Sequence, residues 1–173
     1  MIPWRSALLT TAVVAGVIGL SACTPVPTPE PTPTPLFASE AEAFKAAERV
    51  FRDYVTAENA LQGGDQSAKP ELYLTGDALS RDIESKRASK ANGTRVEGAT
   101  KLARFTGESA GPANGSVRAA VCLDVSTTKI LSSQGEDITP GSRPALVSLD
   151  VRFLSEGIDL KIIAMSPGAV PCT

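Results

Sequence analysis

The chemistry open to this chain is limited first by a residue type that it lacks. The 173-residue sequence contains no histidine. Ser-His-Asp and Cys-His nucleophilic sites, histidine-ligated zinc or iron, and histidine acid–base catalysis are therefore excluded. Carboxylate and tyrosine chemistry remains, because an Asp base with Tyr and Asp donors is enough for proton transfer in an apolar pocket. The candidates for such a site are Asp53, Tyr54, Tyr73 and Asp77, and no motif gives any of them a catalytic role.

The cysteines are the other reactive side chains, and the first of the three follows an apolar leader. Arg5 precedes an uncharged run, Ser6 to Leu20, with the charge and hydrophobicity pattern of a secretory signal. The run ends in Leu-Ser-Ala-Cys at residues 20–23, which resembles the lipobox of bacterial lipoproteins. This resemblance implies cleavage before Cys23 and thioether attachment of diacylglycerol to its thiol. The alternatives are an uncleaved signal-anchor helix and a secreted protein with an incidental cysteine, but the run is short of the ~20 residues that a spanning helix needs.

A proline-rich segment follows Cys23. Proline alternates with small residues from Pro25 to Pro35, which prevents both helix and sheet. In a polyproline II conformation, at ~3.1 Å per residue, residues 24–35 would reach ~37 Å. We interpret the segment as a stalk that lifts a domain above the lipid headgroups, with a PxxP ligand as the alternative. The chain thus divides into a removed signal peptide (1–22), a lipidated cysteine with its stalk (23–37) and a single domain (38–173).

The two remaining cysteines, Cys122 and Cys172, lie in the domain. Outside the membrane they meet an oxidising environment, where a pair is most simply a disulfide. A redox pair or a set of metal ligands is the alternative. The sequence has no CxxC motif and no histidine to activate a thiol, which favours the disulfide.

Two helices are predicted in the first half of the domain. Ser39 to Glu42 form a capping box, and the helix behind it ends at Gly63-Gly64. Its apolar stripe consists of Phe44, Ala47, Phe51, Tyr54, Val55 and Leu61. Because Tyr54 belongs to this stripe, a packed core residue is its simplest interpretation. Residues 70–73 suggest a short helical turn.

The second helix is expected to begin at Thr75 or Asp77 and to end at Asn92-Gly93, which has the form of a left-handed cap. The residues that it should direct inward are Ala78, Leu79 and Ile83.

Strands are predicted from residue 94 onward, where the apolar period changes to two. Residues 94–106 are a weak strand candidate, whereas 117–125, 145–153 and 158–164 alternate clearly. Asn114-Gly115 is a hairpin-turn signal. Alternation indicates an antiparallel sheet with one covered face, and helices before strands indicate an α+β fold. We therefore expect N-terminal helices packed on a curved antiparallel sheet of about four strands.

This order of elements resembles a known family. With the stretches FRDYVTAENAL, LYLTGDAL, VCLDVS and RPALVSLDVRF and a terminal PC, residues 38–173 are similar to small actinobacterial lipoproteins with a nuclear-transport-factor-2-like domain. The resemblance implies a cone-shaped roll whose first helix and concave sheet enclose an apolar pocket. It also supports the Cys122–Cys172 bond, because similar chains pair a cysteine in the VCLDVS strand with one at the end. No catalytic motif, cofactor or metal site carries over.

These observations predict a lipid-anchored, non-catalytic binding or accessory module of the cell envelope, on the outer face of the cytoplasmic membrane. Its expected partners are the membrane, through the anchor, and an envelope protein, a wall polymer or a small apolar ligand. The net charge of −2 gives no reason to expect nucleic acid. One alternative is a pocket enzyme of isomerase or dehydratase type. Another is a subunit of an export or envelope machine, with an apolar patch on the open side of the sheet.

Charge is uneven along the domain. Residues 81–104 hold seven basic and three acidic side chains, a surface suited to anionic lipid or wall polymer, or simply an ordinary solvated edge. For calcium, the acidic pairs to consider are Asp65 with Glu71 and Glu136 with Asp137, and neither lies in an oxygen-ligand loop pattern.

Overall fold

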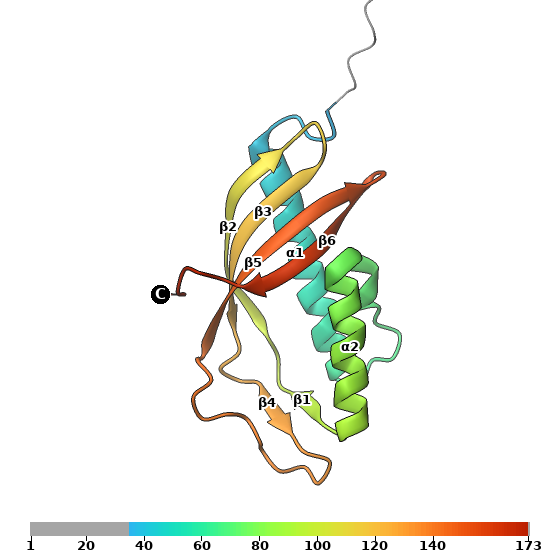
Figure 1. Cartoon of the computed structure of the whole chain (residues 1–173), viewed down its shortest axis with the longest axis vertical. Coiled ribbons are helices and arrows are strands. Elements are labelled where there is room, and N and C mark those ends of the chain that lie inside the picture. The colour runs from blue at the N-terminus through green and yellow to red at the C-terminus, as the bar shows by residue number, and fades with distance from the viewer. Residues whose placement is uncertain (1–34, 173) are drawn as a thin grey trace, which may run out of the picture. The chain divides into compact units, whose positions relative to one another are not determined.

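The computed structural model describes residues 35–172, in which two α-helices with a 3-10 turn between them precede six strands (Figure 1). The predicted signal peptide, Cys23 and the stalk up to residue 34 lie outside the described residues. Among the helices of the described part, none is long and apolar enough to cross a membrane.

Helix α1 (Glu40–Gln62) begins at the predicted capping box. The Ser39 hydroxyl accepts a hydrogen bond from the Glu42 amide (3.2 Å), and the Glu42 carboxylate accepts one from the Ala38 amide (2.7 Å). Both bonds occupy amides that a helix start otherwise leaves without a partner. The apolar stripe is confirmed, since one face of α1 is buried through Ala43, Ala47, Phe51 and Val55.

The turn η1 (Pro70–Tyr73) and helix α2 (Gly76–Asn92) follow where they were predicted. Ala78 is buried and Leu79 half-buried, but the prediction that Ile83 faces inward is wrong, because its side chain is 39% exposed. The inner face of α2 continues from Ala78 through polar residues, and Ile83 lies beside that face. Gly93, with φ 65°, ends α2 in the left-handed conformation predicted for it.

Four of the strands form one antiparallel sheet in the order β2-β3-β5-β6. Neighbouring strands of this sheet are also consecutive in the chain, except that β4 lies between β3 and β5 in the sequence. The remaining two, β1 and β4, form a separate antiparallel pair. The predicted α+β class with about four sheet strands is confirmed. The bounds are β1 (Arg95–Glu97), β2 (Lys101–Gly111), β3 (Ser116–Asp124), β4 (Lys129–Leu131), β5 (Leu146–Glu156) and β6 (Asp159–Pro167).

Two features of the strands differ from the prediction. The weak candidate at 94–106 is divided into β1 and β2, because the chain turns at Gly98. Gly98 has φ 94°, and an added Cβ would lie 2.2 Å from the Thr127 carbonyl oxygen, so only glycine fits there. Strand β4 was not predicted, since its three residues are too few to show a period.

The core lies between α1 and the concave face of the sheet. Alternate residues of β3, β5 and β6 point toward α1, as the sequence pattern indicated. Ile158 is an exception to that prediction: it lies in the β5–β6 turn and is 98% exposed. The buried inward residues of the sheet are Val117, Ala119, Val121, Val151, Phe153, Leu160 and Ile162.

The domain has two distinct ends along its length (Figure 1). At the first, which we call the proximal end, the amides of Leu36 and Phe37 both donate to the Pro112 carbonyl in the β2–β3 turn (2.9 and 3.2 Å). The Ser155 amide lies near the end of β5. It donates to the carbonyl of Gly115, which also belongs to the β2–β3 turn (3.1 Å). The other, distal end holds β1, β4 and the loop at 132–145.

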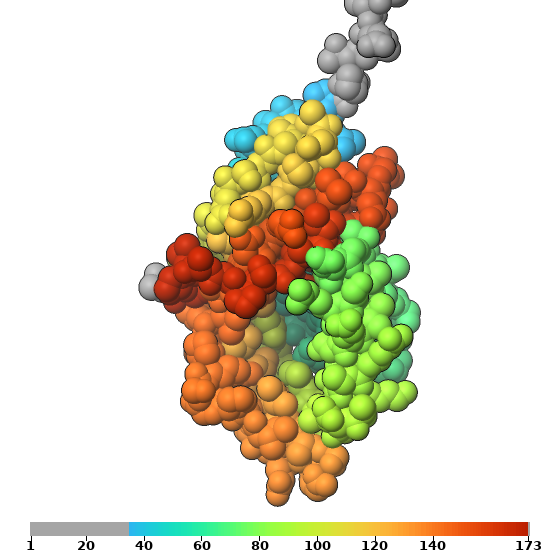
Figure 2. All heavy atoms as spheres, in the orientation of Figure 1, coloured from blue at the N-terminus to red at the C-terminus, as the bar shows by residue number. Residues whose placement is uncertain are grey.

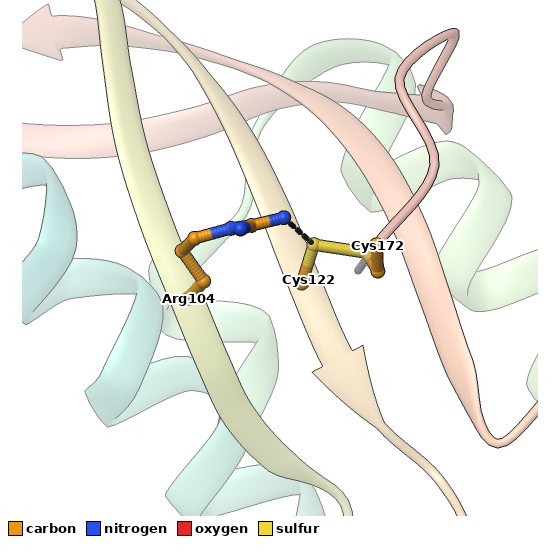
Figure 3. The surroundings of a disulfide bond; sticks show 3 residues. All are labelled: Arg104, Cys122 and Cys172. Atoms are coloured by element: carbon orange, nitrogen blue, oxygen red, sulfur yellow. Dashed lines mark hydrogen bonds between the residues drawn. A yellow bond between two sulfur atoms is a disulfide. The ribbon is translucent and has the colours of Figure 1, made fainter.

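A disulfide crosses the outer face of the sheet (Figure 3). After β6, the Gly168 amide donates to the Ser148 carbonyl of β5 (2.9 Å), and the chain then passes to β3. There Cys172 is bonded to Cys122, with Cα atoms 5.7 Å apart. Cys122 points away from α1 yet is buried, because this C-terminal segment covers it. The structure thus brings together the two cysteines that sequence analysis paired.

A testable prediction concerns Gly107 in β2, which faces the first turns of α1. A Cβ added at Gly107 would lie 2.4 Å from the Phe44 ring. We expect Gly107→Ala to lower the free energy of unfolding by about 1–3 kcal/mol, because the ring must be displaced. Urea unfolding measures this change. Gly141→Ala is the matched control, since its Cβ would meet nothing within 4 Å. If Phe44→Ala does not reduce the effect of Gly107→Ala, the proposed clash is wrong.

A second prediction concerns the disulfide, which closes a loop with a sequence separation of 50. In the chain-entropy treatment, a loop of this length contributes about 4 kcal/mol to the free energy of unfolding. The Cys122→Ser/Cys172→Ser double variant should lose stability of this order in urea unfolding. Adding a reductant should lower the stability of the parent protein to that of the variant. Equal stability of the oxidised and reduced parent protein would contradict the prediction.

Candidate functional site

A small recess lies between α1, α2 and the end of β6. Its volume is about 230 Å³. Figure 2 shows the surface hollowed beside α2, with α1 at the floor of the hollow. The fold places these side chains together because α2 lies alongside β6 while α1 crosses the concave face of the sheet. The lining residues are Tyr54 from α1, Ala78, Arg81, Asp82 and Ser85 from α2, and Met165 from β6.

A charged cluster at the edge of the recess joins the two helices. The Lys86 ammonium of α2 donates to the Glu58 carboxylate of α1 and to the Asp82 carboxylate one turn earlier in α2, both at 2.9 Å. Glu58, Asp82 and Lys86 are all half-buried. One cation is therefore shared by two carboxylates, and the pair with Glu58 fixes α2 against α1.

Burial determines the protonation of the groups in this cluster. It raises the pKa of the Glu58 carboxyl above its usual value, and the hydrogen bond from Lys86 only partly offsets that effect. Burial alone would lower the pKa of the Lys86 ammonium, but its hydrogen bonds to Asp82 and Glu58 outweigh it and raise the pKa. Lys86 is therefore charged at neutral pH, and the Glu58 carboxyl holds its proton more tightly than a solvent-exposed glutamate does.

Tyr54 is one of the polar side chains that line the recess. Burial, reinforced by the negative charges of Glu58 and Asp82, raises the pKa of its phenol well above the usual value. The hydroxyl thus stays protonated at physiological pH and can donate a hydrogen bond. It makes no hydrogen bond to another residue in the range 35–172, although its ring packs on Phe51 with centroids 6.0 Å apart.

The four acid–base candidates from the sequence do not form one site. Tyr54 lines the recess, as well as packing against the core as expected. Tyr73, in η1, borders a different groove, and Asp53 and Asp77 are exposed on the helices. The sequence analysis missed Glu58, Asp82 and Lys86. Asp82 and Lys86 could have been found from their spacing. They are four residues apart on a predicted helix, and the inward-facing Ala78 lies four residues before Asp82, so all three share one face.

One member of each acidic pair considered for calcium has partners close by in the protein. The Asp65 carboxylate accepts from the amide and hydroxyl of Ser67 (2.9 and 2.6 Å). The Asp137 carboxylate accepts from the Thr139 amide (3.0 Å) and lies 3.4 Å from the Lys129 ammonium. Within the described range, no group of three or more Cys, Asp or Glu residues is placed to hold a metal ion.

The outer face of the sheet is charged. Arg118 of β3 pairs with Asp150 of β5 and, at 3.2 Å, with Glu108 of β2. These three charged side chains occupy part of the open side of the sheet, where a subunit of an export or envelope machine was expected to carry an apolar patch. A groove of about 330 Å³ runs beside the disulfide, lined by Glu108, Cys122 and Val170 among others.

Comparison with known proteins bears on the fold. No protein-family model and no curated protein matches the sequence. Among solved structures, the chain is similar to the intermembrane space region of the chloroplast protein ARC6, with a TM-score of 0.50 and 12% sequence identity. The match covers 72% of this chain and 95% of that one. At this identity the likeness concerns the arrangement of helices and strands alone.

The raised pKa of Glu58 makes a prediction about pH. A carboxyl with a higher pKa in the folded state contributes stability below its unfolded pKa, and that contribution is lost as pH rises through the folded pKa. As pH falls from neutral toward the ordinary glutamate pKa of 4.5, the Glu58 contribution should therefore increase. In Glu58→Gln this increase should disappear, while Lys86 keeps its bond to Asp82.

The measurement is the free energy of urea unfolding across that pH range for both proteins. Glu84→Gln, on the exposed side of α2, is the control for the loss of one carboxyl. An unchanged pH dependence in Glu58→Gln would show that burial of this carboxyl does not control its protonation.

Proposed function

We propose that this chain is a lipid-anchored, non-catalytic binding or accessory module of the cell envelope, held on the outer face of the cytoplasmic membrane. The support for the anchor is the sequence: the Leu-Ser-Ala-Cys motif at residues 20–23 after an apolar leader, and the proline-rich segment behind it. Diacylglycerol supplies two acyl chains, which anchor stably where one chain holds only marginally.

The single observation that carries the non-catalytic part is the filled interior between α1 and the sheet. Phe51, Phe153 and Ile162 are each less than 2% exposed and occupy the space that an enclosed pocket would need. Ligand pockets commonly measure ~300–1,000 Å³ and bury most of the ligand. The recess at Tyr54 is smaller, at about 230 Å³, and open. It suits one polar group of a partner better than a whole substrate.

The surfaces of the domain favour particular classes of partner. The recess offers the Tyr54 hydroxyl, the Ser85 hydroxyl and the Arg81 guanidinium, which suit an acceptor group of an envelope protein or wall polymer. A small apolar ligand fits less well, because Asp82 lies in the same lining. The chain has a net charge of −2, so nucleic acid is not proposed as a partner.

A pocket enzyme of isomerase or dehydratase type is the second candidate, and a specific observation favours it. The raised pKa values of Tyr54 and Glu58 are the kind of perturbation found at acid–base sites. However, Glu58 is held by Lys86 and is not among the residues that line the recess. A base for proton abstraction must reach the substrate, so the geometry favours the binding module.

The anchor leads to a direct prediction. Cys23→Ala should abolish labelling with radioactive palmitate, because the thiol that accepts the lipid is removed, and should release the chain from the membrane fraction. Cys122→Ser/Cys172→Ser is the matched control and should remain labelled and anchored. Palmitate incorporation and fractionation of cells by ultracentrifugation are the measurements. A parent chain that carries no palmitate would overturn the proposed function.

A further inference from the structure

The proximal end of the domain carries an exposed apolar rim, formed by Leu36, Leu72 and Ile158. Their side chains are 47%, 62% and 98% exposed, and they come from the start of the domain, from η1 and from the β5–β6 turn. Two adjoining grooves of about 380 and 440 Å³ connect them, and Phe37 lines both. The rim is thus one surface, built from three segments far apart in the sequence.

Basic side chains surround the rim. Lys45 and Arg49, both exposed on α1, line the grooves together with Lys161 of β6. Glu42 and Asp159 are the acidic residues of the same lining. The lining thus has one more cation than carboxylate, and the Glu42 carboxylate is directed to the Ala38 amide in capping α1. Apolar residues ringed by Lys and Arg are suited to a surface with an apolar interior and anionic headgroups.

The chain before the domain joins it at this rim. Leu36 is fixed by the bond from its amide to Pro112, and only residues 24–35 separate it from Cys23. In a polyproline II conformation those twelve residues would reach ~37 Å, and a fully extended chain of that length no more than ~43 Å. A tether of this length keeps the proximal end near the lipid surface at a high effective concentration, so a weak contact is sufficient for docking.

We propose that the apolar rim docks on an anionic phospholipid membrane, with Ile158 inserted among the headgroups. This inference rests on the proposed lipid anchor, because the tether supplies the proximity. A specific protein interface usually buries ~800 Å² on each partner. Three apolar residues around open grooves fall short of such a contact, whereas a single protruding isoleucine beside Arg49 and Lys161 is sufficient for shallow insertion.

Docking in this way would orient the domain. The β1–β4 pair and the 132–145 loop would stand away from the membrane, since they lie at the distal end. The sequence analysis considered the basic residues at 81–104 for contact with lipid. Two of them, Lys90 and Arg95, lie on either side of the α2 C-terminus. This C-terminus is at the distal end, because Gly93 packs beside Ser133 of the distal loop. These side chains would therefore face away from the lipid and remain available to a wall polymer.

The test uses the lipidated chain in vesicles of phosphatidylcholine and phosphatidylglycerol. Trp4 is the one tryptophan of the sequence and precedes the predicted cleavage point, so Ile158→Trp places a single reporter in the mature chain. Ile138→Trp, at a residue 47% exposed in the distal loop, is the matched control. With brominated acyl chains in the vesicles, the Ile158→Trp emission should be severalfold lower than in unbrominated vesicles, while the Ile138→Trp emission should be unchanged.

The outcomes separate the proposals. Replacing Ile158 by Asp should weaken the contact about tenfold, the equivalent of one lost isoleucine transfer. In a chain with its reporter at the neighbouring exposed residue Asp159 (Asp159→Trp), bromine quenching should fall accordingly. Equal emission of the 158 and 138 reporters in brominated vesicles would overturn docking at the rim. A blue shift of the 158 reporter without lipid, growing with protein concentration, would assign the rim to a second copy and also overturn it. Palmitate labelling, scored separately, shows whether the anchor itself has failed.

Discussion

The contact between one face of α1 and the concave face of the sheet is the constraint on which the fold depends. Ala43 and Ala47 are fully buried, and their small side chains let the helix backbone approach the strands closely. Phe51 and Phe153 then fill the space further along. With this interior occupied, the recesses that residues 35–172 form lie open at the margins of the domain.

Much of this fold could be predicted from the sequence, because its signals are local. The capping box at Ser39, the αL glycine at Gly93 and the period-two strands each depend on neighbouring residues. The predictions that were wrong concern burial, which is not a local property. Ile158 matches the alternation of β6 but lies in the turn, and Ile83 matches helical spacing but remains exposed. Whether an apolar residue is covered depends on distant segments, which a pattern along one segment does not record.

The candidate site was less predictable for the same reason. Tyr54 was found as an aromatic residue on an apolar stripe, but its neighbours Glu58 and Asp82 come from two helices whose packing the sequence does not specify. The distal loop gives a second example. Arg143 donates to the Thr128 hydroxyl and the Val125 carbonyl (2.9 and 3.0 Å), and thereby holds the loop to the end of β3. Neither bond has a signature in residue spacing, since each links side chains or carbonyls across an irregular segment.

The order of the elements has a consequence for synthesis. Helix α1 precedes every strand on which it packs, so its apolar face is made before any partner exists. Phe153 follows Phe51 by about a hundred residues, and at ribosomal rates the interval is roughly 5 to 20 s. During that time the nascent chain exposes an amphipathic helix to its surroundings. A chain with this topology would therefore benefit from a chaperone or translocase that shields α1 until the last hairpin is complete.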